Sequence, residues 1–98
     1  MKVIFSIYAR QELDDASLYL ETASAGLGDL FRSEIRAAIK RIIRHPQAWV
    51  RERGDVRKCL LHRFPYKILY SIESDHIFII AIAHQHRRPD YWIDRGGQ

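Results

Sequence analysis

A change in the spacing of the apolar residues in the middle of this chain limits the folds that it can adopt. From Ala9 to Pro46 the apolar residues recur at helical spacing, whereas after Val56 they follow the two-residue period of strands. A chain that forms helices first and consecutive strands afterwards has to cover one layer with the other. The pattern therefore predicts an α+β domain.

The first half of the chain predicts one strand and two helices. Residues 2–7 form a short run with β-branched residues, which is typical of a strand, and the helical period begins at Ala9. The segment 25–29 contains two glycines and ends this helix. We expect Asp29 to cap a second helix that ends near Arg44, before Pro46, and we expect the two helices to form an antiparallel hairpin.

The second helix has an apolar and a basic side. The apolar row consists of Phe31, Ile35, Ala38 and Ile42, and the basic ridge opposite consists of Arg32, Arg36, Lys40 and Arg44. We interpret the ridge as a solvated helix face in preference to a nucleic-acid contact. In the first helix we likewise assign the acidic residues, Glu12 among them, to an outer face.

After a loop over 46–55, three strands are predicted at 56–64, 66–73 and 76–83. Pro65 and the pair Ser74–Asp75 mark the turns between them. The element order is thus β-α-α-β-β-β, with the helical hairpin packed on one face of a small, mainly antiparallel twisted sheet. The position of the first strand in that sheet stays open.

Length and composition indicate one domain over 1–98, because 98 residues are enough to bury a core and rarely divide. The single cysteine, Cys59, has no disulfide partner and is expected in the core. No apolar run approaches the ~20 residues that span a bilayer, and no targeting segment is recognisable, so we expect a cytoplasmic protein without a membrane partner.

The net charge of +4 is one functional signal. Most of the excess lies from position 51 onward, and such an excess attracts polyanions, although many small domains are equally basic without such a partner. We expect Arg57 and Arg63 to point to the same side of the uncovered sheet face, near Lys67. Ordinary surface ion pairs are the alternative for both arginines.

A second group of polar side chains follows the last strand and consists of His84, His86, Arg87, Arg88, Tyr91 and Trp92. His84 and His86 are expected to point to opposite sides with no carboxylate nearby, so we expect no metal and no cofactor. Metal-free RNA cleavage is the one enzyme class that these residue types permit. Its candidate catalytic residues are His84, Arg87, Tyr91, Lys67 and Arg63.

Two motifs carry a resemblance to a known family. The first motif is Arg63-Phe64-Pro65-Tyr66, and the second is the ending His84-x-x-Arg87-x-Pro89-x-x-Trp92. The helix that starts at 28–31 precedes both motifs. With these features the chain resembles the RelE/ParE superfamily of toxins over nearly its whole length. The resemblance implies the toxin of a type II toxin–antitoxin system. It also implies a cognate antitoxin as partner, with operator DNA bound only through the antitoxin.

The resemblance leaves two molecular targets. RelE-like members cut mRNA in the ribosomal A site, whereas ParE-like members bind DNA gyrase. RelE-like nucleases have an arginine where this chain has Lys67, and lysine lacks the bidentate fork. Arg87 or Arg88 and Tyr91 match other nuclease positions, but the incomplete set favours the ParE-like branch.

Whether the chain is an enzyme stays open, with a RelE-like endoribonuclease as the first alternative and a non-toxic basic binding module or decayed toxin as the second. The residues expected to bind a target or nucleic acid are Arg57, Arg63, Lys67, His86, Arg87, Arg88 and Trp92.

Overall fold

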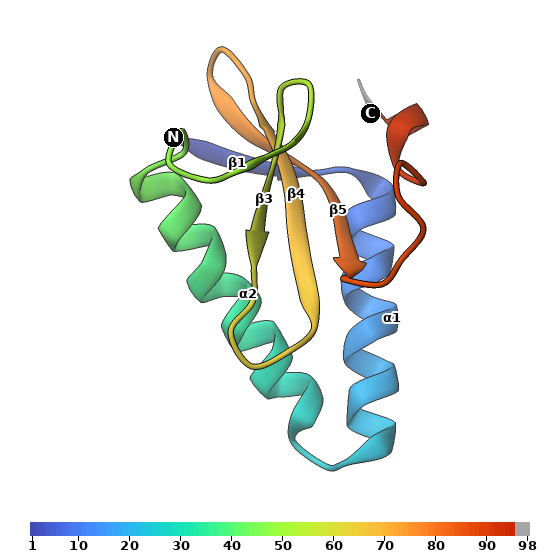
Figure 1. The fold of residues 1–98 in the computed structure, drawn as a ribbon. Coiled ribbons are helices and arrows are strands. Elements are labelled where there is room, and N and C mark those ends of the chain that lie inside the picture. The colour runs from blue at the N-terminus through green and yellow to red at the C-terminus, as the bar shows by residue number, and fades with distance from the viewer. Residues whose placement is uncertain (96–98) are drawn as a thin grey trace.

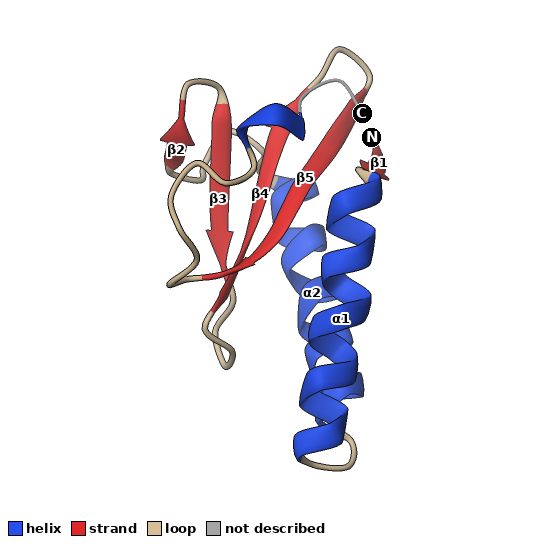
Figure 2. Ribbon diagram, turned by 90° about the vertical axis from the view of Figure 1, so that its right-hand side faces the viewer, coloured by secondary structure: helices blue, strands red, loops and turns tan. Residues whose placement is uncertain are grey.

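The computed structural model describes residues 1–95 and consists of two layers, a helical hairpin and a five-stranded sheet (Figures 1 and 2). The elements are β1 (Lys2–Phe5), α1 (Ile7–Ala23), α2 (Leu27–Arg44), β2 (Arg51–Arg53), β3 (Val56–Leu60), β4 (Tyr66–Ile72), β5 (His76–His84) and the 3₁₀ turn η1 (Ile93–Arg95). The predicted α+β class and the helical hairpin on one sheet face are confirmed. No helix within residues 1–95 is long and apolar enough to cross a bilayer.

The sheet has the strand order β1-β5-β4-β3-β2. β1 lies at one edge, parallel to β5, and the other neighbouring pairs are antiparallel. The first strand therefore pairs with the last one. The short β2 lies within the segment predicted as a loop, so that prediction was incomplete. β3 ends at Leu60, not at residue 64, and the chain turns before Tyr66 around Pro65, as predicted.

A single residue, Ser6, joins β1 to α1. Its hydroxyl accepts a hydrogen bond from the Ala9 N–H at 2.9 Å and donates one to the Ile80 carbonyl at 2.9 Å. Its own N–H donates to the Ile79 carbonyl at 2.9 Å. Ser6 therefore caps α1 while it is tied to β5, so the strand ends at Phe5 and the predicted extension of the strand to Ile7 is wrong.

The turn between the helices differs from the predicted cap. Gly26 occupies the N-cap position of α2 with a φ of 88°, a conformation that favours glycine. The carboxylate of Glu21 accepts the N–H groups of Gly26 at 2.9 Å and Gly28 at 3.0 Å. Glu21 thus satisfies the N-terminus of α2 from the preceding helix, whereas Asp29 lies within the first turn and does not cap it.

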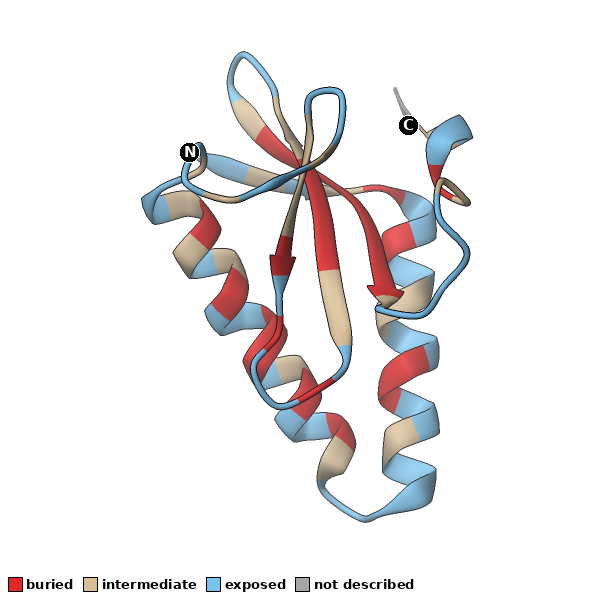
Figure 3. Cartoon of the chain, viewed as in Figure 1, coloured by how far each residue is buried: buried red, intermediate tan, exposed pale blue. Residues whose placement is uncertain are grey.

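The core lies between the hairpin and the sheet (Figure 3). The predicted apolar row of α2 is buried and packs in one cluster with side chains of β4 and β5. Phe31 is fully buried, and its ring meets the rings of Phe64 at 5.3 Å and Tyr66 at 5.0 Å edge to face. Cys59 is fully buried in the same cluster, as expected. Packing of Phe31 therefore links α2 to the residues on either side of Pro65.

Truncating Phe31 tests this packing. We expect Phe31→Ala to lower the free energy of unfolding by about 3–5 kcal/mol, because the change leaves a cavity among buried aromatic rings. Urea denaturation followed by circular dichroism measures the loss. Leu18→Ala, at an exposed position of α1, is the control and should change stability by less than about 0.5 kcal/mol. A loss below about 1 kcal/mol for Phe31→Ala would contradict the assigned core.

Candidate functional site

The sheet face turned away from the helices is partly covered by the C-terminal segment. Trp92 is only 6% exposed and packs with Leu69, Phe78, Ile80 and Ala81 in a second small core, against which Tyr91 also lies. Trp92 was expected among the residues that bind a partner, yet its indole is buried. The segment after β5 is therefore held by packing on the sheet.

One carboxylate, Glu12 of α1, organises this segment. It accepts hydrogen bonds from the Ile82 N–H at 3.0 Å, the Tyr91 hydroxyl at 2.7 Å and the Arg95 guanidinium at 2.8 Å. Ile82 belongs to β5 beyond the residues that pair with β1. Glu12 thus satisfies part of the strand edge and also anchors the C-terminal segment, so its predicted place on a solvated outer face was wrong.

Tyr91 is engaged as a hydrogen-bond donor to Glu12. Burial raises the pKa of the Tyr91 hydroxyl, and the hydrogen bond to the Glu12 carboxylate raises it further. The Arg87 guanidinium lies 4.0 Å from the centre of the Tyr91 ring, and that of Arg95 lies 4.7 Å from it. At neutral pH the phenol is therefore protonated, and it lies beside two guanidinium groups, which suits a structural role and not that of a general base.

The two histidines after β5 lie close together. The rings of His84 and His86 are 5.4 Å apart, and the His86 N–H donates to Nδ1 of His84 at 3.1 Å. The prediction that they point to opposite sides was wrong, because residues two positions apart in an extended segment face the same side. His84 also packs edge to face on Tyr66 at 5.2 Å.

A surface pocket of about 260 Å³ lies beside these histidines. It is lined by Glu12, Asp15, Ala16, Tyr19, Tyr66, Ile82, His84 and Arg87. It brings together two of the candidate catalytic residues, His84 and Arg87. Among residues 1–95 no cluster of three or more histidine, cysteine or acidic side chains is arranged to hold a metal ion.

The remaining candidates lie elsewhere. Lys67 contacts Glu52 of β2 at 3.1 Å, and its side chain is only 16% exposed. Arg57 donates to the carbonyls of Gln47 at 3.1 Å and Trp49 at 2.7 Å, so it ties β3 to the loop after α2. These contacts occupy both side chains within the molecule.

Arg63 also departs from the predicted arrangement. It lies in the turn after β3, where its Nε is 3.3 Å from the Glu34 carboxylate of α2. The expectation that Arg57 and Arg63 share the uncovered sheet face was wrong, because β3 ends before Arg63 and the even spacing no longer applies. Arg63 instead pairs with a buried carboxylate, which differs from the ordinary surface ion pair considered as the alternative.

Glu34 is a buried carboxylate that sequence reasoning did not single out. It accepts the backbone N–H groups of His62 and Arg63, and it is only 7% exposed. Burial by itself raises the pKa of Glu34, but the hydrogen bonds from Arg63 and His62 outweigh burial and place the pKa below its ordinary value. The carboxylate therefore fastens the turn between β3 and β4 to α2.

Comparison with known proteins gives one family. A family model described as the ParE toxin of the type II toxin–antitoxin system, parDE, matches residues 3–89. A solved structure described as the chromosomal ParDE TA system from P. aeruginosa is similar with a TM-score of 0.70 and 20% sequence identity, over 86% of this chain and 95% of that chain. At this identity the structural likeness concerns the fold alone. No curated protein sequence matches the chain.

Removing the Glu12 carboxylate tests its hold on the C-terminal segment. In a Trp49→Phe background, where Trp92 is the single tryptophan, we expect Glu12→Ala to shift the Trp92 emission to longer wavelength and to raise acrylamide quenching at least twofold. Released packing would expose the indole to water. Asp15→Ala is the matched control, because within residues 1–95 its carboxylate accepts a hydrogen bond only from Gln11 on the same helix. Unchanged emission in Glu12→Ala would contradict the assigned anchor.

The lowered pKa of Glu34 predicts a pH-dependent stability. Its folded-state pKa lies below the ordinary 4.5, so its contribution is present above about pH 4.5 and is lost as the pH falls through the folded-state pKa. Glu34→Gln should cost about 1–3 kcal/mol at pH 7 and progressively less in acid. Urea denaturation at pH 7 and pH 3 measures both values, with the exposed Glu73→Gln as control. A difference that stays constant between the two pH values would contradict this assignment.

Proposed function

The chain belongs to the ParE toxin family of type II toxin–antitoxin systems, and from this membership we propose that it arrests growth by binding DNA gyrase. A cognate antitoxin, which the family implies, neutralises it by forming a complex. That complex contacts operator DNA through the antitoxin. Because gyrase acts on chromosomal DNA, the place of action is the cytoplasm.

The observation that carries this proposal is that three of the five nuclease-type side chains, Tyr91, Lys67 and Arg63, are engaged in contacts within the molecule. Metal-free RNA cleavage needs an acid, a base and cations within hydrogen-bond reach of one phosphate. Here Tyr91 donates to Glu12, Lys67 pairs with Glu52, and Arg63 pairs with Glu34. These contacts involve three different carboxylates, whereas His84 and Arg87 line one pocket. The arrangement supports action by binding over action by cleavage.

The surface that we assign to the target is the turn after β5. His86, Arg87 and Arg88 are exposed there, and the Glu12 anchor holds the following segment in place. Arg87 is stacked on the Tyr91 ring, which limits its freedom and lowers the entropic cost of binding. A short, cationic and preorganised turn is suited to contact an acidic surface of a protein partner.

A supercoiling assay with purified gyrase tests the target. We expect the wild-type chain to reduce supercoiling and to trap cleaved plasmid. The double variant Arg87→Ala/Arg88→Ala should need at least a tenfold higher concentration for the same effect, because it removes two exposed charges of the turn. Arg36→Ala/Lys40→Ala on α2 removes the same charge elsewhere and should stay within threefold of wild type.

Two outcomes would contradict the proposal at different levels. Full supercoiling at saturating concentrations of the folded wild-type chain would exclude gyrase as the target. Unimpaired growth after strong induction without antitoxin would exclude toxicity itself and favour a non-toxic basic binding module.

A further inference from the structure

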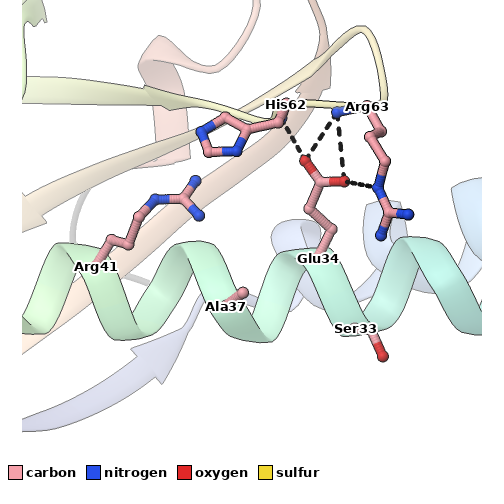
Figure 4. Close-up of a pocket in the computed structure, with 6 residues that line it drawn as sticks. All are labelled: Ser33, Glu34, Ala37, Arg41, His62 and Arg63. Carbon is pink, nitrogen blue, oxygen red and sulfur yellow. Dashed lines mark hydrogen bonds and ion pairs between the residues drawn. The ribbon is translucent and has the colours of Figure 1, made fainter.

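A second pocket, with other lining residues than the first, lies between α2 and the turn that joins β3 to β4 (Figure 4). Its volume is about 450 Å³, and it is lined by Ser33, Glu34, Ala37, Arg41, His62 and Arg63. The small side chains of Ser33 and Ala37 leave its helix side open. Nothing in the proposed gyrase contact uses this pocket.

The charges around the pocket are unequal. Glu34 supplies the only carboxylate among the lining residues, and it is already occupied by the N–H groups of His62 and Arg63 and by the Arg63 guanidinium. The close-up shows Glu34 turned toward Arg63, with Arg41 on the other side of Ala37 (Figure 4). The second guanidinium, that of Arg41, thus faces the pocket without a carboxylate of its own.

Arg41 carries a buried donor that lacks an acceptor. Its Nε is buried and has no hydrogen-bond partner within the described part of the chain. Its other contacts are weak ones, with Sγ of Cys59 at 3.9 Å and the Trp49 ring at 6.0 Å. A guanidinium with an unused donor is complementary to a planar carboxylate, because the carboxylate accepts two parallel hydrogen bonds.

The basic ridge of α2 continues the same electrostatic surface. Arg36, Lys40 and Arg44 are exposed along α2 beside the residues that line the pocket. For these three side chains the structure of residues 1–95 shows no ion pair, and Arg36 contacts only the Ser33 hydroxyl. Arg32, at the start of the ridge, is already paired with Asp14 at 2.8 Å. An acidic segment that lies along α2 would neutralise the ridge.

We propose that this pocket receives a carboxylate side chain from an acidic segment of the antitoxin that lies along α2, with Arg41 as its anchor. The inference rests on the proposed antitoxin partner and assigns the chemistry of its contact. A single side chain can enter a pocket between a helix and a turn, whereas a nucleic-acid backbone binds along several surface cations. The Arg41 guanidinium lies in this recess and not on the exposed ridge, and this position favours a protein carboxylate.

The test places a carboxylate of the chain itself in the pocket. Ala37→Glu positions an acid four residues before Arg41, where it competes with the antitoxin for the guanidinium. Ala25→Glu makes the same chemical change in the exposed turn between the helices and is the matched control. Titration calorimetry with the purified full-length antitoxin should show at least tenfold weaker binding for Ala37→Glu and less than a threefold change for Ala25→Glu.

A second variant keeps the proposal testable if Ala37→Glu fails to fold. Arg41→Lys keeps the charge but removes the fork, and it should weaken antitoxin binding about fivefold. In nitrogen-edited NMR spectra of the wild-type chain, the Arg41 Nε–H resonance should move on addition of the antitoxin, as expected for a new hydrogen bond.

The outcomes separate this inference from the proposed function. Wild-type affinity in the folded Ala37→Glu or Arg41→Lys chain would overturn the pocket assignment and leave the antitoxin partner intact. Absence of binding by the wild-type chain would overturn both. Fluorescence anisotropy measures whether the wild-type chain and the Ala37→Glu variant bind a single-stranded 20-nucleotide RNA. Loss of RNA binding in Ala37→Glu, with antitoxin binding unchanged, would assign the pocket to nucleic acid and overturn the proposal.

Discussion

The position of the C-terminal segment depends on the carboxylate of Glu12. It bonds to the Ile82 N–H of β5, to the Tyr91 hydroxyl and to the Arg95 guanidinium, so one side chain connects the helical layer, the sheet and the last described segment. Because the Tyr91 hydroxyl donates its hydrogen bond to Glu12, the phenol has a structural role. The same contacts fix the position of the turn that carries Arg87 and Arg88, which forms a cationic surface. The proposed binding of a target depends on this anchor.

Glu34 acts in the same way on the second helix. It accepts backbone hydrogen bonds from His62 and Arg63 in the turn between β3 and β4, and it forms an ion pair with the Arg63 side chain. Arg63, one of the cationic candidates, and Arg95 each form an ion pair with one helical carboxylate. The cations that stay unpaired lie on exposed surfaces where a partner can reach them.

The apolar periods were sufficient to predict the helical hairpin, the core row of α2 and the three consecutive strands, because burial of one face imposes those periods. They did not predict the parallel pairing of β1 with β5, which depends on contacts far apart in the sequence. Glu12 and Glu34 had a signal that was overlooked. Each lies three residues after a buried residue, Ala9 and Phe31, and so on the buried stripe of its helix. The places of Arg57 and Arg63 could not be predicted, because the end of β3 is set by its pairing with β4.

We propose that this member of the ParE toxin family acts by binding a target and not by cutting RNA. The most direct measurement is primer extension on mRNA in a purified translation system that contains stalled ribosomes and the isolated chain. We expect full-length transcripts at concentrations of the chain that saturate its target. Cuts at codon-spaced positions within the ribosomal A site would contradict the proposed action by binding, because Tyr91, Lys67 and Arg63 would have to leave their internal contacts to act on one phosphate.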